Sequence, residues 1–575
     1  MRLLLLKIRI LLQRLFPMSE AHSMLPWATL VGVVGALATI AFRESLSGVQ
    51  WLLFGHSGSL VEIAKGLPWY MRVVVPAAGG VVAGIFLVLA QRFASRAASD
   101  YMEAIAIGDG HIPLAQTLLR SLSSLCTIAS GGSIGREGSM VQLSALSASI
   151  IGRFTQLDPS RLRLLVACGA AAGITAAYNA PIAGAFFVTE IVLGAIVMDN
   201  FGPVVVASVV ANIMMREFPG YQPAYEMPPF PAVANLEVVL FVGLGFIAGF
   251  AAPQFLRLLD TFKRGFHASG LQLPVRLGIG GLLVGILSIW APQVWGNGYS
   301  VVNSLLHEQW LWSTVLALLA FKIVATALTT GSGAVGGIFT PTLFVGAAIG
   351  HLFGQTMHLL LPHGVSAPFT YAMVGMGAFL AAATNAPLMA ILMIFEMTLS
   401  YQVMLPLMLS CVVAYFVARR MESASMYEIT IRRNREEKAR LRLRSTQMRE
   451  LIKPAETVLP LEATFDELTK MFLQYPVKYI YIVDHANRFQ GVVALQDLAS
   501  AMADKEAAAA RQAKDFLRRD LLHVVTPGMS LDDALQCFLL HQGERLPAIQ
   551  SKDDPVLLGA VFKTSLLDAY FRLTG

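Results

Sequence analysis

Charged residues are scarce in this chain: Asp, Glu, Lys and Arg make up 14% of its 575 residues, while 55% are hydrophobic. Soluble globular domains carry about 25% charged residues, so the composition excludes an ordinary soluble protein. Long apolar stretches recur instead, for example Trp27–Phe42, Val73–Leu89, Leu236–Phe255, Gly278–Trp295 and Trp312–Leu328. Because lipid offers the backbone no hydrogen-bond partners, we expect these stretches to form membrane-spanning helices.

Cysteine is also rare. The four cysteines, at positions 126, 168, 411 and 537, lie far apart in the sequence, which argues against a disulfide framework or a cysteine-rich metal site. They are expected to be small buried residues. The sequence also shows no metal-ligand spacing and no nucleophile paired with a general base. We therefore predict neither an enzyme nor a resident cofactor or metal.

Basic residues gather at both ends of the apolar region. Residues 1–20 begin MRLLLLKIRILLQRLF and predict an amphipathic helix on the inner membrane surface, since charges interrupt the apolar run and no signal-peptide cleavage site follows. Ten arginines and lysines lie between Arg419 and Arg449. The positive-inside rule therefore predicts a multi-pass protein of the cell inner membrane with both termini in the cytoplasm. The cluster is expected to contact lipid rather than nucleic acid.

The membrane region contains an internal repeat. Residues 169–191 read GAAAGITAAYNAPIAGAFFVTEI, and residues 375–397 read GMGAFLAAATNAPLMAILMIFEM. Both copies carry Asn-Ala-Pro, and in both a glutamate follows eleven residues after the asparagine, Glu190 and Glu396. Such repeats are typical of transporters whose site lies between two halves. The matching glutamates favour a structural role at a helix end or repeat interface; Glu190 is also a proton-path candidate.

Each half also has a glycine-rich segment that interrupts the apolar sequence, GREGS at 135–139 and GGIFTP at 336–341. Glycine breaks a helix and allows close approach of a ligand. We expect one helix to restart at Ser139, a good capping residue, and another to have Pro341 at its first position. One helix N-terminus stabilises an anion by roughly 0.3–2 kcal/mol, far less than the cost of dehydrating an ion. Several such termini must therefore converge.

These motifs resemble the CLC family of chloride channels and transporters. The resemblance rests on GREG at 135–138, GIFTP at 337–341, the doubled Asn-Ala-Pro segment and EMT at 396–398, and it covers residues 21–430. It implies an all-α polytopic membrane domain of two inverted repeats with broken helices, at residues 21–427. It also implies a homodimer in which each protomer has its own pore, with chloride or a similar small anion as the bound substrate ion.

The resemblance also assigns site residues. Glu137 matches the gating glutamate, whose carboxylate occupies an anion site and leaves it when protonated. The implied anion-binding residues are Ser99, Arg136, Gly138, Ile338, Phe339 and Tyr427, of which Ser99 and Tyr427 would donate hydroxyls and the others backbone amides. Segment 109–113 (DGHIP) is the alternative to Ser99, but only one helix fits between it and Gly135, so we prefer Ser99.

Coupling to protons is left open by the resemblance. Family members that exchange chloride for protons usually carry a second, inward-facing glutamate, and its position here, ten residues after Pro181, is Ile191. Isoleucine cannot relay a proton. Either protons pass by water or another residue, or the protein is a passive anion channel, which we favour. Alternatives from other classes are a regulated cation transporter, which would need carboxylates along its pore, and a membrane-anchored ligand sensor.

Beyond a basic linker at 428–450 the sequence changes to an α/β pattern that occurs twice, at 451–505 and 516–575. In the first unit, Thr464 and Glu467 have capping-box spacing before two strands, 478–483 and 490–494, and a helix. The second unit repeats the order: a helix from Ser530, strands 545–549 and 557–561, and a helix at 565–573. This order resembles a pair of CBS domains.

Nucleotide-binding CBS domains commonly use a Ser or Thr and an Asp after their second strand. In this chain only Asp497, in the first unit, fits that pattern. A structural or dimerising role for the pair is therefore favoured over binding of an adenine nucleotide.

Overall fold

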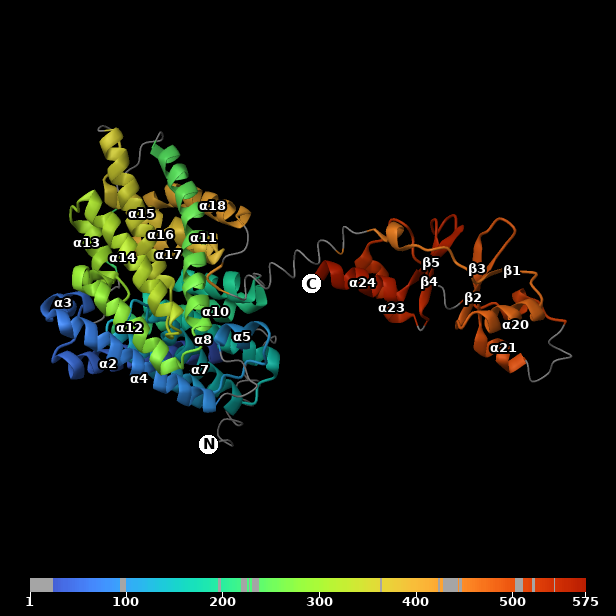
Figure 1. Ribbon diagram of the computed structural model, residues 1–575, viewed down its shortest axis with the longest axis horizontal. Coiled ribbons are helices and arrows are strands. Elements are labelled where there is room, and N and C mark those ends of the chain that lie inside the picture. The colour runs from blue at the N-terminus through green and yellow to red at the C-terminus, as the bar shows by residue number, and fades with distance from the viewer. Residues whose placement is uncertain are drawn as a thin grey trace. The chain divides into compact units, whose positions relative to one another are not determined.

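The fold was analysed in a computed structural model. It describes residues 24–93, 100–194, 198–218, 225–226, 228–229, 237–361, 364–421, 425–427, 443, 447–501, 510–519, 523–541 and 543–574. The predicted N-terminal helix, Ser99 and most of the basic linker lie outside these residues. The chain divides into two compact units, Met1–Ile431 and Arg432–Gly575 (Figure 1). Each unit is considered by itself.

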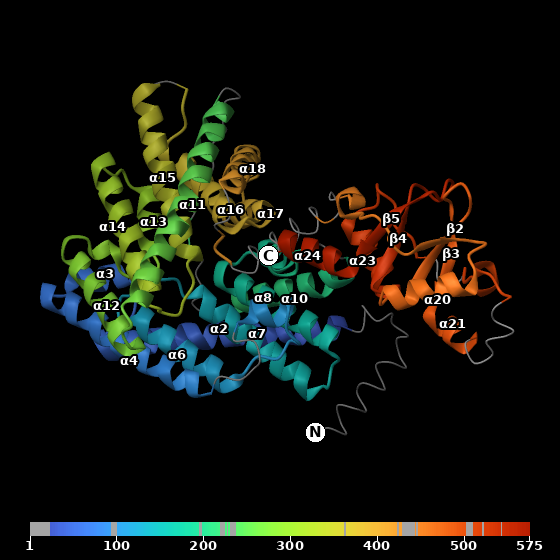
Figure 2. The same ribbon diagram turned by 45° about the vertical axis from the view of Figure 1, so that its right-hand side comes forward.

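The first unit is helical throughout its described length (Figures 1 and 2). Among the described residues, eight helical segments are long and apolar enough to cross a membrane. They are α2 (Leu25–Phe54), α4 (Trp69–Arg92), α8 (Pro159–Tyr178), α11 (Val238–Ala268), α12 (Leu273–Trp290), α14 (Trp312–Gly331), α15 (Phe339–Leu360) and the segment Tyr401–Arg420, which is η5 (Tyr401–Val403) followed by α18 (Met404–Arg420).

Shorter helices complete this unit. They are α3 (Leu60–Gly66), α5 (Tyr101–Ala106), α6 (Leu114–Ala129), α7 (Glu137–Phe154), α9 (Pro181–Phe186), η2 (Phe187–Leu193), α10 (Met198–Glu217), η4 (Pro292–Val294), α13 (Tyr299–His307), α16 (Pro368–Thr384) and α17 (Pro387–Thr398). The apolar stretches predicted to be helical are confirmed, with one correction. The stretch Gly278–Trp295 is not one helix, because α12 ends at Trp290 and Pro292 starts the separate 3-10 turn η4.

The repeat predicted from sequence is confirmed in the backbone. α8 and α16 both end at an asparagine in the left-handed conformation, Asn179 with φ 58° and Asn385 with φ 58°. The alanine that follows has a non-helical backbone in both copies, with φ −128° and ψ 83° at Ala180 and φ −130° and ψ 78° at Ala386. The proline then opens the next helix, Pro181 for α9 and Pro387 for α17. Asparagine tolerates this conformation better than most residues, and proline suits the first helical position. The motif therefore specifies the same helix-turn-helix corner twice.

Close packing of helix backbones holds the corners in place. A Cβ atom added at Gly346 of α15 would lie 2.5 Å from the carbonyl oxygen of Gly375 in α16, and one added at Gly375 would lie 2.5 Å from that of Gly346. Only glycine allows this reciprocal approach. Small residues at helix contacts are the usual means by which membrane helices pack closely. Of the cysteines expected to be buried, Cys168 and Cys411 are buried, while Cys126 and Cys537 are half-buried.

The second unit contains two α/β modules. In the first, a three-stranded sheet has the order β1 (Val458–Pro460), β2 (Tyr479–Val483), β3 (Phe489–Ala494), with β1 parallel and β3 antiparallel to β2; helices α20 (Phe465–Gln474) and α21 (Leu495–Ala501) accompany it. In the second, α23 (Leu531–Leu540) precedes the antiparallel pair β4 (Arg545–Ile549) and β5 (Leu557–Phe562), and α24 (Lys563–Thr574) follows. The predicted order is confirmed; the short strand β1 was not predicted.

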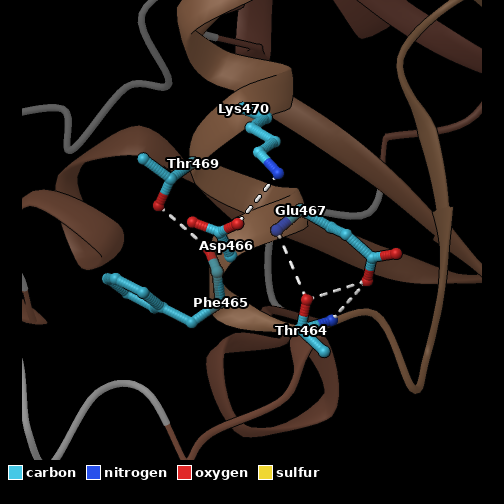
Figure 3. A network of polar contacts seen from close by, with 6 residues as sticks. All are labelled: Thr464, Phe465, Asp466, Glu467, Thr469 and Lys470. Atoms are coloured by element: carbon cyan, nitrogen blue, oxygen red, sulfur yellow. Dashed lines mark hydrogen bonds and ion pairs between the residues drawn. The ribbon is translucent and has the colours of Figure 1, made fainter.

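The predicted capping box starts α20 (Figure 3). The backbone amide of Thr464 donates to a carboxylate oxygen of Glu467 at 2.8 Å, and the amide of Glu467 donates to the Thr464 hydroxyl at 3.4 Å. The bonds donated by the Thr464 amide and hydroxyl lower the pKa of Glu467 below its usual value. Two amides of the first turn, which has no intrahelical acceptors, are thereby satisfied.

We predict that Thr464→Ala lowers the local stability of α20 by about 1 kcal/mol, because the cap is lost. Hydrogen exchange of the α20 amides in the full-length protein, followed by mass spectrometry, measures this change. The Glu467 contribution is present above the carboxyl pKa of the unfolded chain and disappears as pH falls through the lowered folded value. Protection of the wild-type helix, corrected for intrinsic exchange, should therefore decrease on acidification. Thr469→Ala, the same change within α20, is the control, and equal effects of the two substitutions would contradict the capping role.

Candidate functional site

The two glycine-rich segments meet as a small antiparallel bridge. The amide of Gly135 donates to the carbonyl oxygen of Gly337 at 2.7 Å, and the amide of Gly337 donates to that of Gly135 at 2.8 Å. Two residues after each glycine a helix begins, α7 at Glu137 and α15 at Phe339. The bridge therefore brings one helix N-terminus from each half of the repeat to the same place. This is the convergence that the glycine-rich segments predicted.

Two predicted details of these helix starts are wrong. α7 begins at Glu137 rather than Ser139, because Arg136 already has a helical backbone with φ −83° and ψ −14°. Ser139 therefore lies within the first turn, and its buried hydroxyl has no hydrogen-bond partner in the described part of the chain. Pro341 is the third residue of α15 rather than the first. The amides of a first turn lack intrahelical acceptors, so proline costs no hydrogen bond there.

Backbone amides at the two helix starts are left without acceptors. Within the described residues, no hydrogen bond is found for the amides of Arg136, Gly138, Ile338 or Phe339. These are the four predicted backbone donors, and the bridge gathers them from both halves. Unpaired N–H groups at helix N-termini favour a negatively charged ligand through their partial positive charge. The arrangement can offset part of the dehydration cost that a single helix N-terminus cannot.

The carboxylate of Glu137 is buried beside this bridge, and the residue is 2% exposed. The Tyr299 hydroxyl, from α13, donates to its Oε1 atom at 2.5 Å. Its Oε2 atom has no hydrogen-bond partner among the described residues. This atom lies close to Gly135, since a Cβ atom added there would be only 2.1 Å from it. The guanidinium of Arg136 lies 5.5 Å from the centre of the Tyr299 ring. An ionisable group buried at membrane depth is usually functional.

Tyr427 is held near the end of the second copy of the repeat. The amide of its neighbour Met426 donates to the carbonyl oxygen of Ala383 at 2.8 Å. The Tyr427 ring lies 5.8 Å from that of Phe187, edge to face. Phe187 is the first residue of the π-helical segment η2, which also contains Ile191. The position is compatible with the predicted hydroxyl donor, and that role stays a prediction.

The helices that flank the two candidates for the central site, Ser99 and segment 109–113, are those expected from the sequence. One helix, α6, fills the interval between 113 and 135, and the further short helix α5 begins two residues after Ser99. Asp100 caps α5 by accepting a bond from the Met102 amide at 3.2 Å. Segment 109–113 is instead tied to α7 by Ser149, whose hydroxyl donates to Gly110 and accepts from the amide of Ile112. This contact gives the alternative segment a structural function.

The repeated glutamates make a reciprocal pair of helix caps. The carboxylate of Glu190 accepts bonds from the amides of residues 388–389 at 3.2 and 2.7 Å, at the start of α17. The carboxylate of Glu396 accepts bonds from the amides of residues 182–183 at 2.9 and 2.7 Å, at the start of α9. Each half therefore caps the post-proline helix of the other. The geometry agrees with the structural reading of both residues; a proton path through Glu190 stays untested.

Asp497 already has a strong partner. The guanidinium of Arg518 donates two bonds to its carboxylate, each 2.5 Å long, and the backbones of Arg518 and Val492 exchange two more. This ion pair fastens the start of α21 to the segment between α21 and α23. A nucleotide would have to compete with a bidentate guanidinium–carboxylate pair, so the geometry agrees with the structural reading of this unit.

Three hydroxyl-bearing residues near Glu137 were not predicted from sequence: Tyr178, Tyr299 and Thr340. Tyr178 immediately precedes Asn-Ala-Pro, where the second copy has Thr384, and this difference between the copies was the available signal. Thr340 lies inside the second glycine-rich motif. Tyr299 follows Gly-Asn-Gly at 296–298, and its contact with Glu137 spans 162 residues, so nothing local identifies it.

The fold and the site together define an anion transport protein. The family model for voltage gated chloride channels matches residues 79–419, and the CBS domain model matches residues 448–504. This chain belongs to the voltage gated chloride channel (CLC) family. It is a multi-pass membrane protein that carries a C-terminal CBS domain, as the sequence predicted.

Curated relatives share most of the membrane unit. A Ralstonia nicotianae protein named as chloride channel protein ClcB-like is 55% identical over 423 residues, which are 73% of this chain and 99% of the relative. The voltage-gated ClC-type chloride channel ClcB of Escherichia coli is 40% identical over 407 residues, 70% of this chain and 96% of the relative.

Solved structures give the same fold. A slow cyanobacterial Cl−/H+ antiporter matches with a TM-score of 0.62 at 26% sequence identity. The match covers 72% of this chain and 97% of the antiporter chain. A eukaryotic CLC transporter has a TM-score of 0.61 at 18% identity and covers 95% of this chain and 99% of its own.

The reciprocal caps lead to a first prediction for this unit. Glu190→Gln and Glu396→Gln should each lower the free energy of unfolding by about 1–3 kcal/mol, because an amide replaces a carboxylate that accepts two backbone bonds. Thermal unfolding of the solubilised protein measures this, with exposed Glu103→Gln as the control. If Glu190→Gln changes proton movement in liposomes while stability stays as in wild type, the structural reading of Glu190 is overturned.

The glycine bridge leads to a second prediction. A Cβ atom at position 135 would lie 2.8 Å from the carbonyl oxygen of Gly337, so Gly135→Ala must displace the bridge. Loss of its two backbone bonds should reduce chloride efflux from proteoliposomes roughly tenfold. Gly48→Ala, at a position with no atom within 4 Å of the added Cβ, is the control. Normal efflux through the Gly135→Ala protein would show that the bridge does not shape the anion path.

Proposed function

We propose that this protein moves chloride across the cell inner membrane through a path in which the carboxylate of Glu137 acts as the gate. The observation that carries the proposal is the Gly135–Gly337 bridge, beside which a buried carboxylate and unpaired amides from both halves meet. A carboxylate and a chloride ion have the same charge and compete for the same kind of donor. Protonation of Glu137 would remove its charge and let it leave the path to an anion.

Passive conduction is the mode we infer. Ile191, which stands where exchangers of this family usually carry the inward-facing glutamate, is fully buried within η2. An aliphatic side chain neither binds nor releases a proton, so the usual internal step of exchange has no group here. Relatives of this chain include a protein described as a channel and one described as a Cl−/H+ antiporter, so the comparison of relatives does not decide the mode.

The remaining features of the proposal follow the sequence and the family. The protein would be a homodimer with one pore in each protomer. Arg419 and Arg420, in the last turn of α18, support a cytoplasmic C-terminus through the positive-inside rule. The second α/β module, 516–575, would complete a CBS pair with a structural or dimerising role. No cofactor is needed for this function.

Reconstitution into liposomes tests the transport mode. Vesicles loaded with chloride and diluted into low-chloride buffer should lose chloride once a potassium ionophore provides charge balance. Internal pH, followed with a trapped dye, should stay constant if conduction is passive. Proton movement against its gradient, driven by chloride, would show exchange in spite of Ile191 and would require another proton carrier.

The gate has its own test. Glu137→Ala should raise chloride efflux at neutral pH and flatten its dependence on pH, because no carboxylate remains to occupy the path or to be protonated. Efflux is measured between pH 5 and 8 in the same vesicles. Glu62→Ala, at an exposed position in α3, is the control. If Glu137→Ala leaves both efflux and its pH dependence as in wild type, the gate is elsewhere.

A further inference from the structure

Glu137 is the end of a chain of hydroxyl groups that crosses between the two halves of the membrane unit. Tyr299 donates to Glu137 at 2.5 Å, and Thr340 donates to the Tyr299 hydroxyl oxygen at 3.3 Å. The hydroxyls of Thr340 and Tyr178 lie 2.9 Å apart. Tyr178 ends α8 in the first half, and Thr340 lies in the first turn of α15 in the second. The chain therefore spans the repeat interface at the proposed gate.

The direction of every bond in this chain follows from counting protons. An ionised carboxylate only accepts, so Tyr299 must use its single proton on Glu137. The oxygen of Tyr299 can then only accept from Thr340, which uses the proton of Thr340. Tyr178 must in turn donate to Thr340. All three hydroxyl protons thus point toward the carboxylate, and bonds aligned in one direction polarise and strengthen one another.

Packing holds the three hydroxyl-bearing residues, Tyr178, Tyr299 and Thr340, in place. Tyr178 and Thr340 are buried, 3% and 0% exposed, and the Tyr178 ring lies 5.1 Å from that of Phe339. The ring of Tyr299 packs against the guanidinium of Arg136 at 5.5 Å and against the ring of Tyr225 at 4.8 Å. The hydroxyl of Tyr299 therefore has little freedom to seek another acceptor. The ionisable groups that interact with these hydroxyls or with Glu137, in the described part of the protein, are Arg136 and the phenols of Tyr225 and Tyr427.

We infer that Tyr299 is a positioning residue that latches the Glu137 carboxylate in the anion path, and that Thr340 and Tyr178 align its hydroxyl for that bond. This inference rests on the proposed role of Glu137 as the gate. The latch favours the ionised, path-blocking carboxylate, because a hydrogen bond to a charged acceptor is stronger than one to the neutral carboxyl group. Protonation of Glu137 removes the charge from the acceptor and weakens this bond, so the latch loosens when the gate opens.

Removal of the latch should increase transport. A hydrogen bond to a charged group changes an equilibrium on the order of tenfold or more, so Tyr299→Phe should raise chloride efflux at neutral pH by roughly that factor. Thr340→Val and Tyr178→Phe should give smaller increases, since they act only through Tyr299. Tyr225→Phe is the matched control: it removes a buried hydroxyl that has no partner in the described residues from a ring packed on the same tyrosine.

Double substitutions separate a latch from a structural role. In a Glu137→Ala background, Tyr299→Phe should change neither efflux nor its pH dependence, because the group that it holds is absent. An equal increase in both backgrounds would overturn the latch and indicate a general loosening of the site. Thr340→Val, nearly isosteric with threonine, supplies the same comparison if the Tyr299 variant does not fold.

The latch and the gate fail in different ways. If Glu137→Ala changes efflux and pH dependence while Tyr299→Phe behaves as wild type, the gate stands and the latch is wrong. If Glu137→Ala itself has no effect, the proposed function fails first. Efflux that rises in Tyr225→Phe as much as in Tyr299→Phe would also overturn the latch, since the bond to Glu137 would then not be the cause.

Discussion

The two backbone hydrogen bonds between Gly135 and Gly337 are the constraint on which the rest of the site depends. They join segments 202 residues apart in the sequence, at N–O distances of 2.7 and 2.8 Å. Because each glycine lies two residues before a helix, the bridge determines where both helix N-termini point their unpaired amides. It also needs glycine, since a side chain at Gly135 would meet the opposite carbonyl oxygen. Backbone proximity, rather than any charged side chain, thus gathers the unpaired amides that the proposed function assigns to the anion.

The duplicated halves build a symmetric frame and an asymmetric site. The frame is symmetric because the Asn-Ala-Pro corners match and because Glu190 and Glu396 cap each other's helices. At the bridge the symmetry ends: the residue two positions after the glycine is Glu137 in one half and Phe339 in the other. Only one half supplies an acid at this position. In the proposed function, duplication therefore supplies a fixed scaffold, and a single residue, Glu137, acts as the gate.

Features of this protein that depend on local chemistry could be predicted from its sequence. The capping box at Thr464, the strands β2 to β5 and the Asn-Ala-Pro repeat are visible in short stretches of sequence, and they were predicted; the short strand β1 was not. The start of α7 was misplaced at Ser139 because the preceding bridge, a contact with Gly337, decides where the helix begins. The contact of Tyr299 with Glu137 was missed for the same reason. It joins positions 162 residues apart, and no spacing rule in a single sequence connects them.

The hydroxyl chain also bears on how protons reach Glu137. A chain whose three protons all point toward the carboxylate can deliver one proton, but it cannot deliver a second until each hydroxyl has turned. Its far end, Tyr178, is 3% exposed, and Ile191 offers no acid or base to reload it. Repeated proton delivery, which exchange requires at every cycle, is therefore disfavoured along this route. The same geometry serves well as a latch, because holding an ionised carboxylate needs aligned donors and no net proton flow. The arrangement of Tyr299, Thr340 and Tyr178 thus adds to the argument from Ile191 for passive conduction.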